Sequence, residues 1–176
     1  LLEAHKLAHC EAHYYAVRAN VPFLLPERAA RIIYLNRTCF NGLYRENSRG
    51  EFNVPMGRYK NPLICDADNL RAVSAALKRA KLAQRPFREV LHHALAGDFI
   101  YFDPPYWPLS DTSSFTAYAK DSFGRADQEE LAAVYRQLAD RGVRVLLSNS
   151  DTPLIHELYA GFTIETVQAA RNVNSK

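Results

Sequence analysis

Cysteine is scarce in this sequence, and the few cysteines present follow neither a disulfide nor a metal-binding spacing. Cys10, Cys39 and Cys65 are odd in number and lie far apart, so they indicate neither a disulfide framework nor a zinc site. No apolar run approaches the roughly 18 residues of a membrane span, and no signal peptide is visible at the start. We therefore expect a cytoplasmic protein with no metal site and no membrane partner.

Methionine is scarcer still. Met56 is the only one, and the chain opens at Leu1 within a helix-like pattern. We therefore expect a fragment of a longer protein, with further chain missing after Lys176 as well. The 176 residues, 48% of them hydrophobic, suffice for a sizeable core. A net charge of +3 permits a polyanionic partner without requiring one.

The most informative stretch is a short apolar run that ends in an acidic and aromatic turn. Residues 97–102 have the aromatic and β-branched character of a buried strand, and Pro104 and Pro105 end it. Asp103 and Tyr106 are then expected in the crevice at the carboxyl end of a strand, where open α/β sheets bind ligands. The alternative is an ordinary turn, in which Asp103 caps the next element and Tyr106 packs.

The sequence Asp103-Pro104-Pro105-Tyr106 resembles the catalytic tetrapeptide of the amino-methyltransferases that use S-adenosylmethionine. Within that family an aspartate at the first position goes mainly with DNA adenine. The exocyclic amine of adenine is a poor nucleophile, and two acceptors, the Asp103 carboxylate and the Pro104 carbonyl, would localise its lone pair for attack on the methyl group. The resemblance further implies that Tyr106 stacks on the flipped base and that Asp103 also lies beside the cofactor.

Residues 36–62 form a second distinctive region. They contain five asparagines, three glycines and two prolines without a sustained period, which predicts a long structured loop of the kind that is usually functional. Its five basic and two acidic residues give a charge of +3, and four aromatic residues are interleaved with them. Composition alone leaves two readings level, a DNA-contacting loop and an ordinary solvated loop.

The order of residues from Asn36 to Lys60 is similar to the target-recognition stretch of the Dam-type adenine methyltransferases. The resemblance implies double-stranded DNA as a partner. It implies DNA contacts in or near this loop for Asn41, Tyr44, Arg45, Asn47, Arg49, Asn53, Arg58, Tyr59 and Lys60. Residues 114–118 resemble the family's loop that closes over the flipped base, which adds Phe115 and Tyr118 to the expected DNA contacts.

Helices are expected at the start of the chain. Residues 1–20 and 29–39 carry apolar residues at helical spacings. His5, His9 and His13 recur every fourth residue in the first of these segments. We expect them to line one solvated face of a helix rather than to bind a metal ion.

A third helix has a capping signal and a basic face. Asp68 or Asn69 can cap a helix that runs to about Lys81. Its basic residues include Lys78 and Arg79, which are either solvated or in contact with a DNA backbone.

The last part of the chain predicts a parallel sheet. Residues 129–141 should form a helix capped by Asp127 and ended by Gly142, and residues 143–147 a second buried strand. Strand, helix and strand at this spacing predict a βαβ unit with parallel strands. Residues 162–167 are expected to add a further strand.

Taken together, the patterns predict an α/β fold: a partial Rossmann-like methyltransferase sheet with an inserted, largely helical and loop-rich target-recognition region. We expect residues 1–90 to be the DNA-binding region and residues 91–176 the C-terminal part of the catalytic domain. The resemblance covers roughly residues 13–176. It implies a monomeric, site-specific DNA adenine methyltransferase, encoded by a bacterium, an archaeon or a phage, that transfers the methyl group of S-adenosylmethionine to N6 of a flipped adenine.

The sequence also departs from that family. Complete members carry a glycine-rich loop for the methionine end of the cofactor, whereas no two of the seven glycines here stand one residue apart. A second, basic N-terminal motif is missing too. We therefore expect this chain alone to bind the cofactor poorly and to be inactive. Two alternatives remain open, an amino-methyltransferase that acts on another base or amine and a DNA-binding module without catalysis. The recognised DNA sequence and the biological role also stay open.

Overall fold

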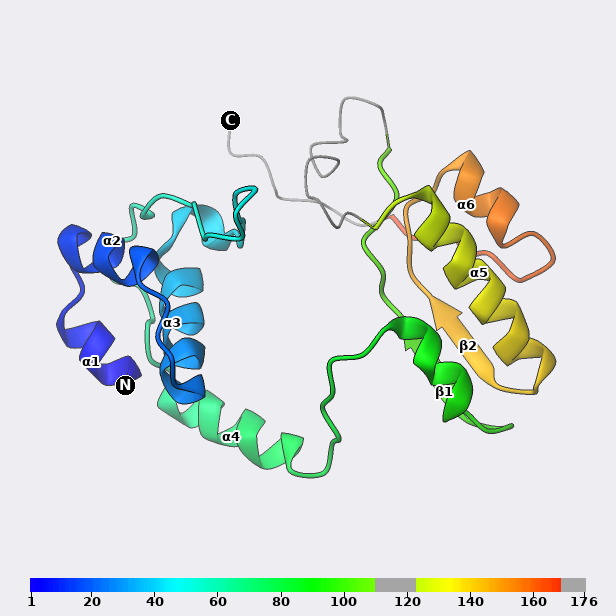
Figure 1. The fold of residues 1–176 in the computed structure, drawn as a ribbon, viewed down its shortest axis with the longest axis horizontal. Helices are drawn as coiled ribbons and strands as arrows, with labels where there is room; N and C mark the ends of the chain where they lie inside the picture. The colour runs from blue at the N-terminus through cyan, green and yellow to red at the C-terminus, as the bar shows by residue number, and fades with distance from the viewer. Residues whose placement is uncertain (110–122, 169–176) are drawn as a thin grey trace. The chain divides into compact units, whose positions relative to one another are not determined.

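The computed structural model describes residues 1–109 and 123–168. The chain divides into two compact units, Leu1–Ala83 (unit 1) and Gln84–Lys176 (unit 2). Unit 1 consists of helices and a long loop, whereas unit 2 contains a small parallel sheet with helices (Figure 1). The division lies a few residues before the boundary expected at residue 90, and the functions assigned to the two parts stay predictions.

Unit 1 is built from four helices and one short 3-10 turn. Their bounds are Leu2–Leu7 (α1), Glu11–Ala19 (α2), Leu25–Thr38 (α3), Phe40–Gly42 (η1) and Ala67–Leu77 (α4). The single helix expected over residues 1–20 is wrong, because the chain breaks after α1 and α2 begins anew. The long helix α3 has a proline in its first turn, where the missing backbone N–H costs nothing.

The core of unit 1 joins the helices to the loop between α3 and α4. Tyr14 of α2 and Tyr34 and Leu35 of α3 are buried together with Phe52 and Val54 of that loop. Burial of these large side chains is the main source of the unit's stability. The loop is therefore part of the folded core.

The three N-terminal histidines do not form a solvated face. His5 stacks on the ring of Tyr34 with centroids 4.9 Å apart, and His9 Nδ1 lies 2.9 Å from the Tyr34 hydroxyl. His13 makes an edge contact with the same ring, and its Nε2 lies 3.1 Å from His5 Nδ1. The expectation failed because the chain breaks between the histidines: His5 lies on α1, His13 on α2 and His9 in the break between these helices, which both pack beside α3.

Unit 2 has two parallel strands, β1 (Phe99–Phe102) and β2 (Arg144–Leu147). The helix α5 (Arg125–Asp140) lies between them in sequence, so the expected parallel βαβ pairing is confirmed. A 3-10 helix, η2 (Phe87–His92), precedes β1, and α6 (Pro153–Leu158) follows β2. The fold class is α/β.

The strands are covered on one face only in the described residues. Ile100 and Phe102 pack with buried residues of α5, including Val134 and Leu138. The alternate residues lie on the other face, where Phe99 is 62% and Tyr101 52% exposed. The expectation of fully buried strands is therefore wrong, because side chains alternate along a strand and α5 and η2 cover one side.

Several predicted boundaries shift. Asp66, not Asp68 or Asn69, caps α4, and its carboxylate accepts the backbone N–H of Asn69. The helix ends at Leu77 rather than near Lys81. The helix α5 begins four residues earlier than expected, and Asp127 accepts the N–H of the cap residue Gly124 from inside the helix.

The further strand expected at residues 162–167 is absent. Those residues belong to the described part of the chain. The chain bends at Phe162, and residues 163–167 form no regular secondary structure. Of the helices in residues 1–109 and 123–168, none has both the length and the apolar character needed to cross a bilayer.

Candidate active site and nucleic-acid interface

The segment that follows β1 contains the expected catalytic residues. We call residues 103–107 the β1-end loop. Phe102 pairs with Leu147 at the ends of β1 and β2, and the N–H of Ser148 donates to the Phe102 carbonyl at 3.1 Å. The β1-end loop therefore starts beside the first residues after β2, at the carboxyl edge of the sheet, as the sequence predicts.

Asp103 is exposed, and one of its carboxylate oxygens is held by the residue that follows β2. The Ser148 hydroxyl donates to Asp103 Oδ1 at 2.7 Å. The Tyr101 hydroxyl lies 2.8 Å from the same serine oxygen. In the part of the chain that the structure describes, Asp103 Oδ2 and the Pro104 carbonyl have no hydrogen-bond partner. Two unengaged acceptors therefore stand on consecutive residues.

The rest of the β1-end loop is fixed by buried amide groups. Gln128 of α5, which is completely buried, donates to the Pro105 carbonyl at 2.9 Å and accepts from Asn149 at 3.1 Å. Asn149 in turn accepts the Trp107 N–H at 2.9 Å. A hydrogen-bonded amide network that is centred on a buried side chain helps to hold a backbone in one conformation. Tyr106 extends from this fixed loop and is 42% exposed.

Sequence reasoning missed the residues that hold this loop. Ser148 and Asn149 directly follow the second expected strand and Tyr101 lies within the first, but nothing in the sequence marks them as partners of this loop. A signal was available for Gln128, which lies on the same helical stripe as the buried Leu131 and Ala132. A polar residue on a buried helical stripe needs a hydrogen-bond partner, and here that partner is the β1-end loop.

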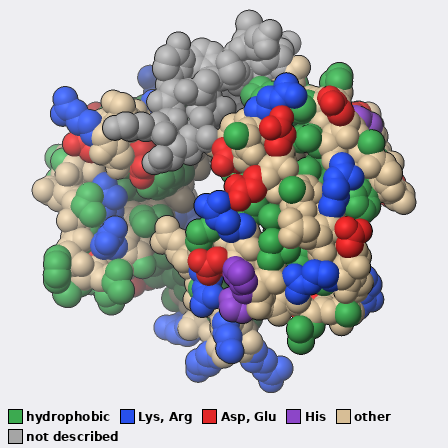
Figure 2. Space-filling view, turned by 45° about the vertical axis from the view of Figure 1, so that its right-hand side comes forward, with side chains coloured by type: hydrophobic (Ala, Val, Ile, Leu, Met, Phe, Trp, Pro, Cys, Tyr) green, Lys and Arg blue, Asp and Glu red, His purple; other side chains and the backbone are tan. Residues whose placement is uncertain are grey.

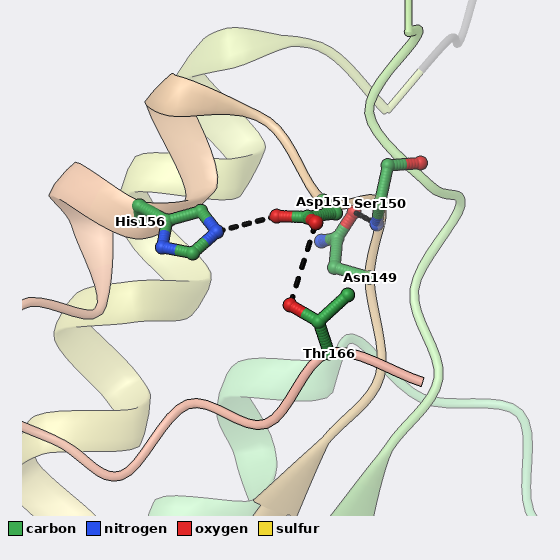
Figure 3. Close-up of polar contacts among 5 residues, drawn as sticks. All are labelled: Asn149, Ser150, Asp151, His156 and Thr166. Atoms are coloured by element: carbon green, nitrogen blue, oxygen red, sulfur yellow. Dashed lines mark hydrogen bonds and ion pairs between the residues drawn. The ribbon is translucent and has the colours of Figure 1, made fainter. Parts of the chain in front are cut away.

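A second polar group lies after β2 and has a structural role (Figure 3). Asp151 Oδ1 lies 2.5 Å from His156 Nε2 of α6, and Thr166 donates to Asp151 Oδ2 at 3.3 Å. The hydrogen bond from His156 holds the pKa of the Asp151 carboxyl below its ordinary value. Because both oxygens of Asp151 are engaged, this carboxylate ties α6 and the segment after it to the strand end.

The other expected site residues lie in the loop between α3 and α4, of which we call residues 39–64 the long loop. Backbone pairing closes it, with bridges between Cys39 and Met56 and between Glu46 and Phe52. At Gly57 an added Cβ would lie 2.8 Å from the Cys39 carbonyl oxygen. Only glycine allows the two chain segments to approach so closely.

The polar side chains at the tip of the long loop bond mainly to one another. Asn47 Oδ1 accepts the backbone N–H groups of Arg49 and Glu51 at 2.9 and 3.0 Å. Arg45 Nε donates to Asn53 Oδ1 at 2.9 Å. The asparagines therefore shape the tip and orient Arg45, and the DNA contacts that the resemblance implies for Asn47 and Asn53 stay a prediction.

The remaining expected contacts are exposed or define turns. Asn41 has a φ of +52° and is followed by Gly42 at +62°, so this pair makes a tight turn. Tyr44 donates a hydrogen bond to Glu46 and remains 53% exposed. Tyr59 lines an open cavity of about 430 Å³.

Three cations of the long loop have no partner among the described residues. The side chains of Arg49, Arg58 and Lys60 are exposed and form no hydrogen bond or ion pair there. Lys60 borders the same cavity as Tyr59, and Arg37 of α3 also lines it. Exposed, unpaired cations such as these three are suited to bind phosphate groups.

Beyond α4 the chain carries more basic residues. Lys78, Arg79 and Lys81 are all exposed. Figure 2 shows basic and acidic side chains interspersed over the face that it presents, with a group of basic ones at its lower edge, at the level of α4 in Figure 1.

Two expected DNA contacts, Phe115 and Tyr118, lie outside the described residues.

Within the described ranges, no group of three or more histidine, cysteine or acidic residues could hold a metal ion. The three cysteines, all described, are free, and burial raises the pKa of the Cys39 thiol.

Comparison with known families decides the assignment. The model of a family described as D12 class N6 adenine-specific DNA methyltransferase matches residues 1–173. This chain belongs to that family. The position of Asp103-Pro104-Pro105-Tyr106 at the end of β1 agrees with the resemblance found in the sequence.

Named relatives come from archaea, bacteria and a phage. The chain is 51% identical over 151 residues to the Type II methyltransferase M.MjaIII of Methanocaldococcus jannaschii, covering 85% of this chain and 52% of that protein. It is 38% identical over 172 residues to the DNA adenine methylase of Escherichia coli K12, covering 95% and 60%. For the DNA N-6-adenine-methyltransferase of Escherichia phage P1, the identity is 41% over 151 residues, covering 85% and 20%. The chain thus spans between 20% and 60% of the length of these curated relatives.

Proposed function

We propose that the natural protein methylates adenine in duplex DNA, with S-adenosylmethionine as the methyl donor. One observation carries the proposal. Asp103 Oδ2 and the Pro104 carbonyl are two unengaged acceptors on consecutive residues, at the carboxyl edge of a parallel sheet, in a chain of an adenine-specific family. An exocyclic amine has two hydrogens to donate, so the two acceptors match its donors.

The chemistry of these groups follows from charge. Drawing both amine hydrogens toward acceptors opposes delocalisation of the nitrogen lone pair into the ring, which makes the nitrogen more nucleophilic. The negative charge of Asp103 stabilises the positive charge that develops on nitrogen as the new C–N bond forms and the bond between that methyl group and the donor's sulfur breaks. The methylated nitrogen then loses one of its two protons to return to neutrality. Tyr106, on the same loop, supplies an aromatic face for a base taken out of the duplex stack.

The residues present fit the acceptor side of this reaction rather than the donor side. S-adenosylmethionine supplies an electrophilic methyl group. The 176 residues contain no two glycines one residue apart, so none of them is assigned to a glycine-rich turn around the donor. The proposal includes a contact between Asp103 and the donor. It also includes that residues 1–176 by themselves do not catalyse the transfer.

For DNA recognition we propose a division of work within the long loop. Arg49, Arg58 and Lys60 contact phosphates, because each is exposed and unpaired in the described structure. Arg45, oriented by Asn53, faces outward from the tip and can reach a base edge. Tyr44 and Tyr59 are exposed aromatic rings that can stack or wedge.

The test uses the full-length natural protein, duplex DNA and S-adenosylmethionine labelled in the methyl group. Asp103→Ala is expected to abolish transfer of label to adenine while DNA affinity is kept. Asp140→Ala is the matched control, because Asp140 is exposed at the end of α5. Transfer that persists in Asp103→Ala would refute the assignment of this carboxylate. An unaltered protein that binds DNA and transfers nothing would favour the binding module.

A further inference from the structure

We propose that Ser148 is a positioning residue for Asp103 and that Tyr101 supports it, so that two hydroxyl groups in series fix the carboxylate. The inference rests on the proposed function, because it assumes that Asp103 receives the target amine. The Ser148 hydroxyl lies 2.7 Å from Asp103 Oδ1, and the Tyr101 hydroxyl lies 2.8 Å from the serine oxygen.

The direction of the two hydrogen bonds follows from the groups involved. An ionised carboxylate can only accept, so the serine must donate its single hydroxyl hydrogen to Asp103. That hydrogen is then no longer available for Tyr101. The tyrosine must therefore donate to the serine oxygen, and the order is Tyr101 to Ser148 to Asp103. A hydroxyl that accepts one hydrogen bond becomes a better donor in the next.

The register of the sheet builds this arrangement. Tyr101 and Asp103 are two residues apart along one strand, so their side chains leave the same face. In the parallel pairing Tyr101 lies opposite Leu146 and Phe102 opposite Leu147. Continued by one residue, the register brings Ser148 beside Asp103 and on its face. A one-residue slip would place the serine on the opposite face.

The consequence for the site is that one carboxylate oxygen is occupied and the other is left for the substrate. The bond from Ser148 is the only hydrogen bond to the Asp103 side chain within the described residues, and Asp103 is exposed. Without it, little else would hold the carboxylate in one rotamer. Small misplacements of a reacting group lower the catalysed rate strongly, with little effect on binding.

The test measures kcat and KM for the full-length protein with duplex DNA and S-adenosylmethionine. When a hydrogen bond to a charged group is removed, the free energy lost corresponds to a decrease of about 10-fold or more in a rate constant. Ser148→Ala is therefore expected to lower kcat by about 10-fold or more and to leave both KM values unchanged. Ser148→Thr, which keeps the hydroxyl, is expected to restore most of kcat. Ser74→Ala is the matched control, since Ser74 is exposed on α4.

Unchanged kcat in Ser148→Ala would overturn the proposal, and so would an equal loss in the alanine and threonine variants. If Ser148→Ala does not fold, Tyr101→Phe decides. This variant removes one hydroxyl from a half-exposed side chain, and a smaller drop in kcat with unchanged KM is expected. In a variant that folds, the double change should be no worse than Ser148→Ala alone, because Tyr101 acts through Ser148.

The proposal and the proposed function fail in different ways. If Asp103→Ala keeps full transfer, the proposed function is wrong whatever Ser148 does. If Asp103→Ala abolishes transfer and both Ser148→Ala and Tyr101→Phe keep normal kcat, only the positioning role is wrong.

Discussion

The β1-end loop and the long loop are held in place by different means. Side chains from other elements bind the first, since Ser148, Asn149 and Gln128 all donate to or accept from it. The second is closed mostly by its own backbone and anchored by buried apolar side chains, among them Phe52 and Val54. The difference suits the two proposed tasks, because bond formation needs fixed atoms and DNA binding needs exposed charge.

The two units also differ in how their apolar surface is covered. In unit 1 the long loop and the helices bury a common core. In unit 2 one face of the sheet packs on α5, whereas Leu146 on the other face is 54% exposed. Parallel sheets in proteins are usually covered on both faces. Because a buried side chain of another element holds the β1-end loop, we expect its substitution to lower stability more than substitutions in the long loop do.

The largest effect is expected for Gln128→Ala. It removes a buried amide and leaves the Pro105 carbonyl and the Asn149 amide without their partner. We expect a loss of about 2–4 kcal/mol in the free energy of unfolding, from lost packing and unsatisfied polar groups. Urea unfolding followed by the fluorescence of Trp107, the only tryptophan, reports on this loop directly.

Gln137→Ala provides the control, because Gln137 is exposed on the same helix. Its effect should stay within about 0.5 kcal/mol. Equal effects of the two substitutions would show that the buried amide network does not hold the β1-end loop.

Tyr14→Phe is expected to have a smaller effect in unit 1. The buried Tyr14 hydroxyl donates to the Val54 carbonyl at 2.9 Å, which ties the long loop to α2. Its loss should cost about 1 kcal/mol, because Arg18 still donates to the same carbonyl. Thermal unfolding of the variant should show this loss, whereas Tyr15→Phe should change little. A loss of the size seen for Gln128→Ala would mean that the long loop depends on side-chain bonds as strongly as the β1-end loop.

Features of the fold and of the site could be predicted from the sequence where the residues that determine them lie close together along the chain. Local signals predicted α3, α5 and both strands, because periodicity and the residues that end an element lie within it. The site loop was located in the same way, from Pro104 and Pro105. Ser148 and Asp103 are 45 residues apart along the chain, and no local sequence pattern predicts that they form a hydrogen bond. Equally, alternation in a strand does not say which face another element will cover.

A pH dependence of the stability of unit 1 is expected from its histidines. Burial, and then the neighbouring His13, lower the pKa of His5 and of His9 from the ordinary value of 6.5. The folded state then binds fewer protons than the unfolded state just below that value, so stability falls as the pH drops through it. Burial also raises the pKa of Tyr34 to about 12, so its hydroxyl stays protonated beside His9.

The measurement is the thermal midpoint of unfolding between pH 7.5 and 5.5, compared with that of His9→Gln. Glutamine can keep a hydrogen bond to Tyr34 without titrating, so the variant should lose less stability on acidification. An unchanged pH dependence in the variant would exclude His9 as its source.

The smallest effect on stability, and a measurable one on binding, is expected for Arg49→Ala. Arg49 is exposed at the tip of the long loop and its side chain has no partner in the described residues. Removing it should change the free energy of unfolding by less than about 0.5 kcal/mol. If Arg49 contacts one phosphate, the slope of log K against log salt for duplex DNA should fall by about 0.9. Arg71→Ala is the control, because Asp68 already pairs with Arg71 at 3.0 Å. An equal slope in the wild type and in Arg49→Ala would remove this cation from the proposed DNA interface. A large loss of stability in Arg49→Ala would contradict the view that the long loop holds its shape without its exposed charges.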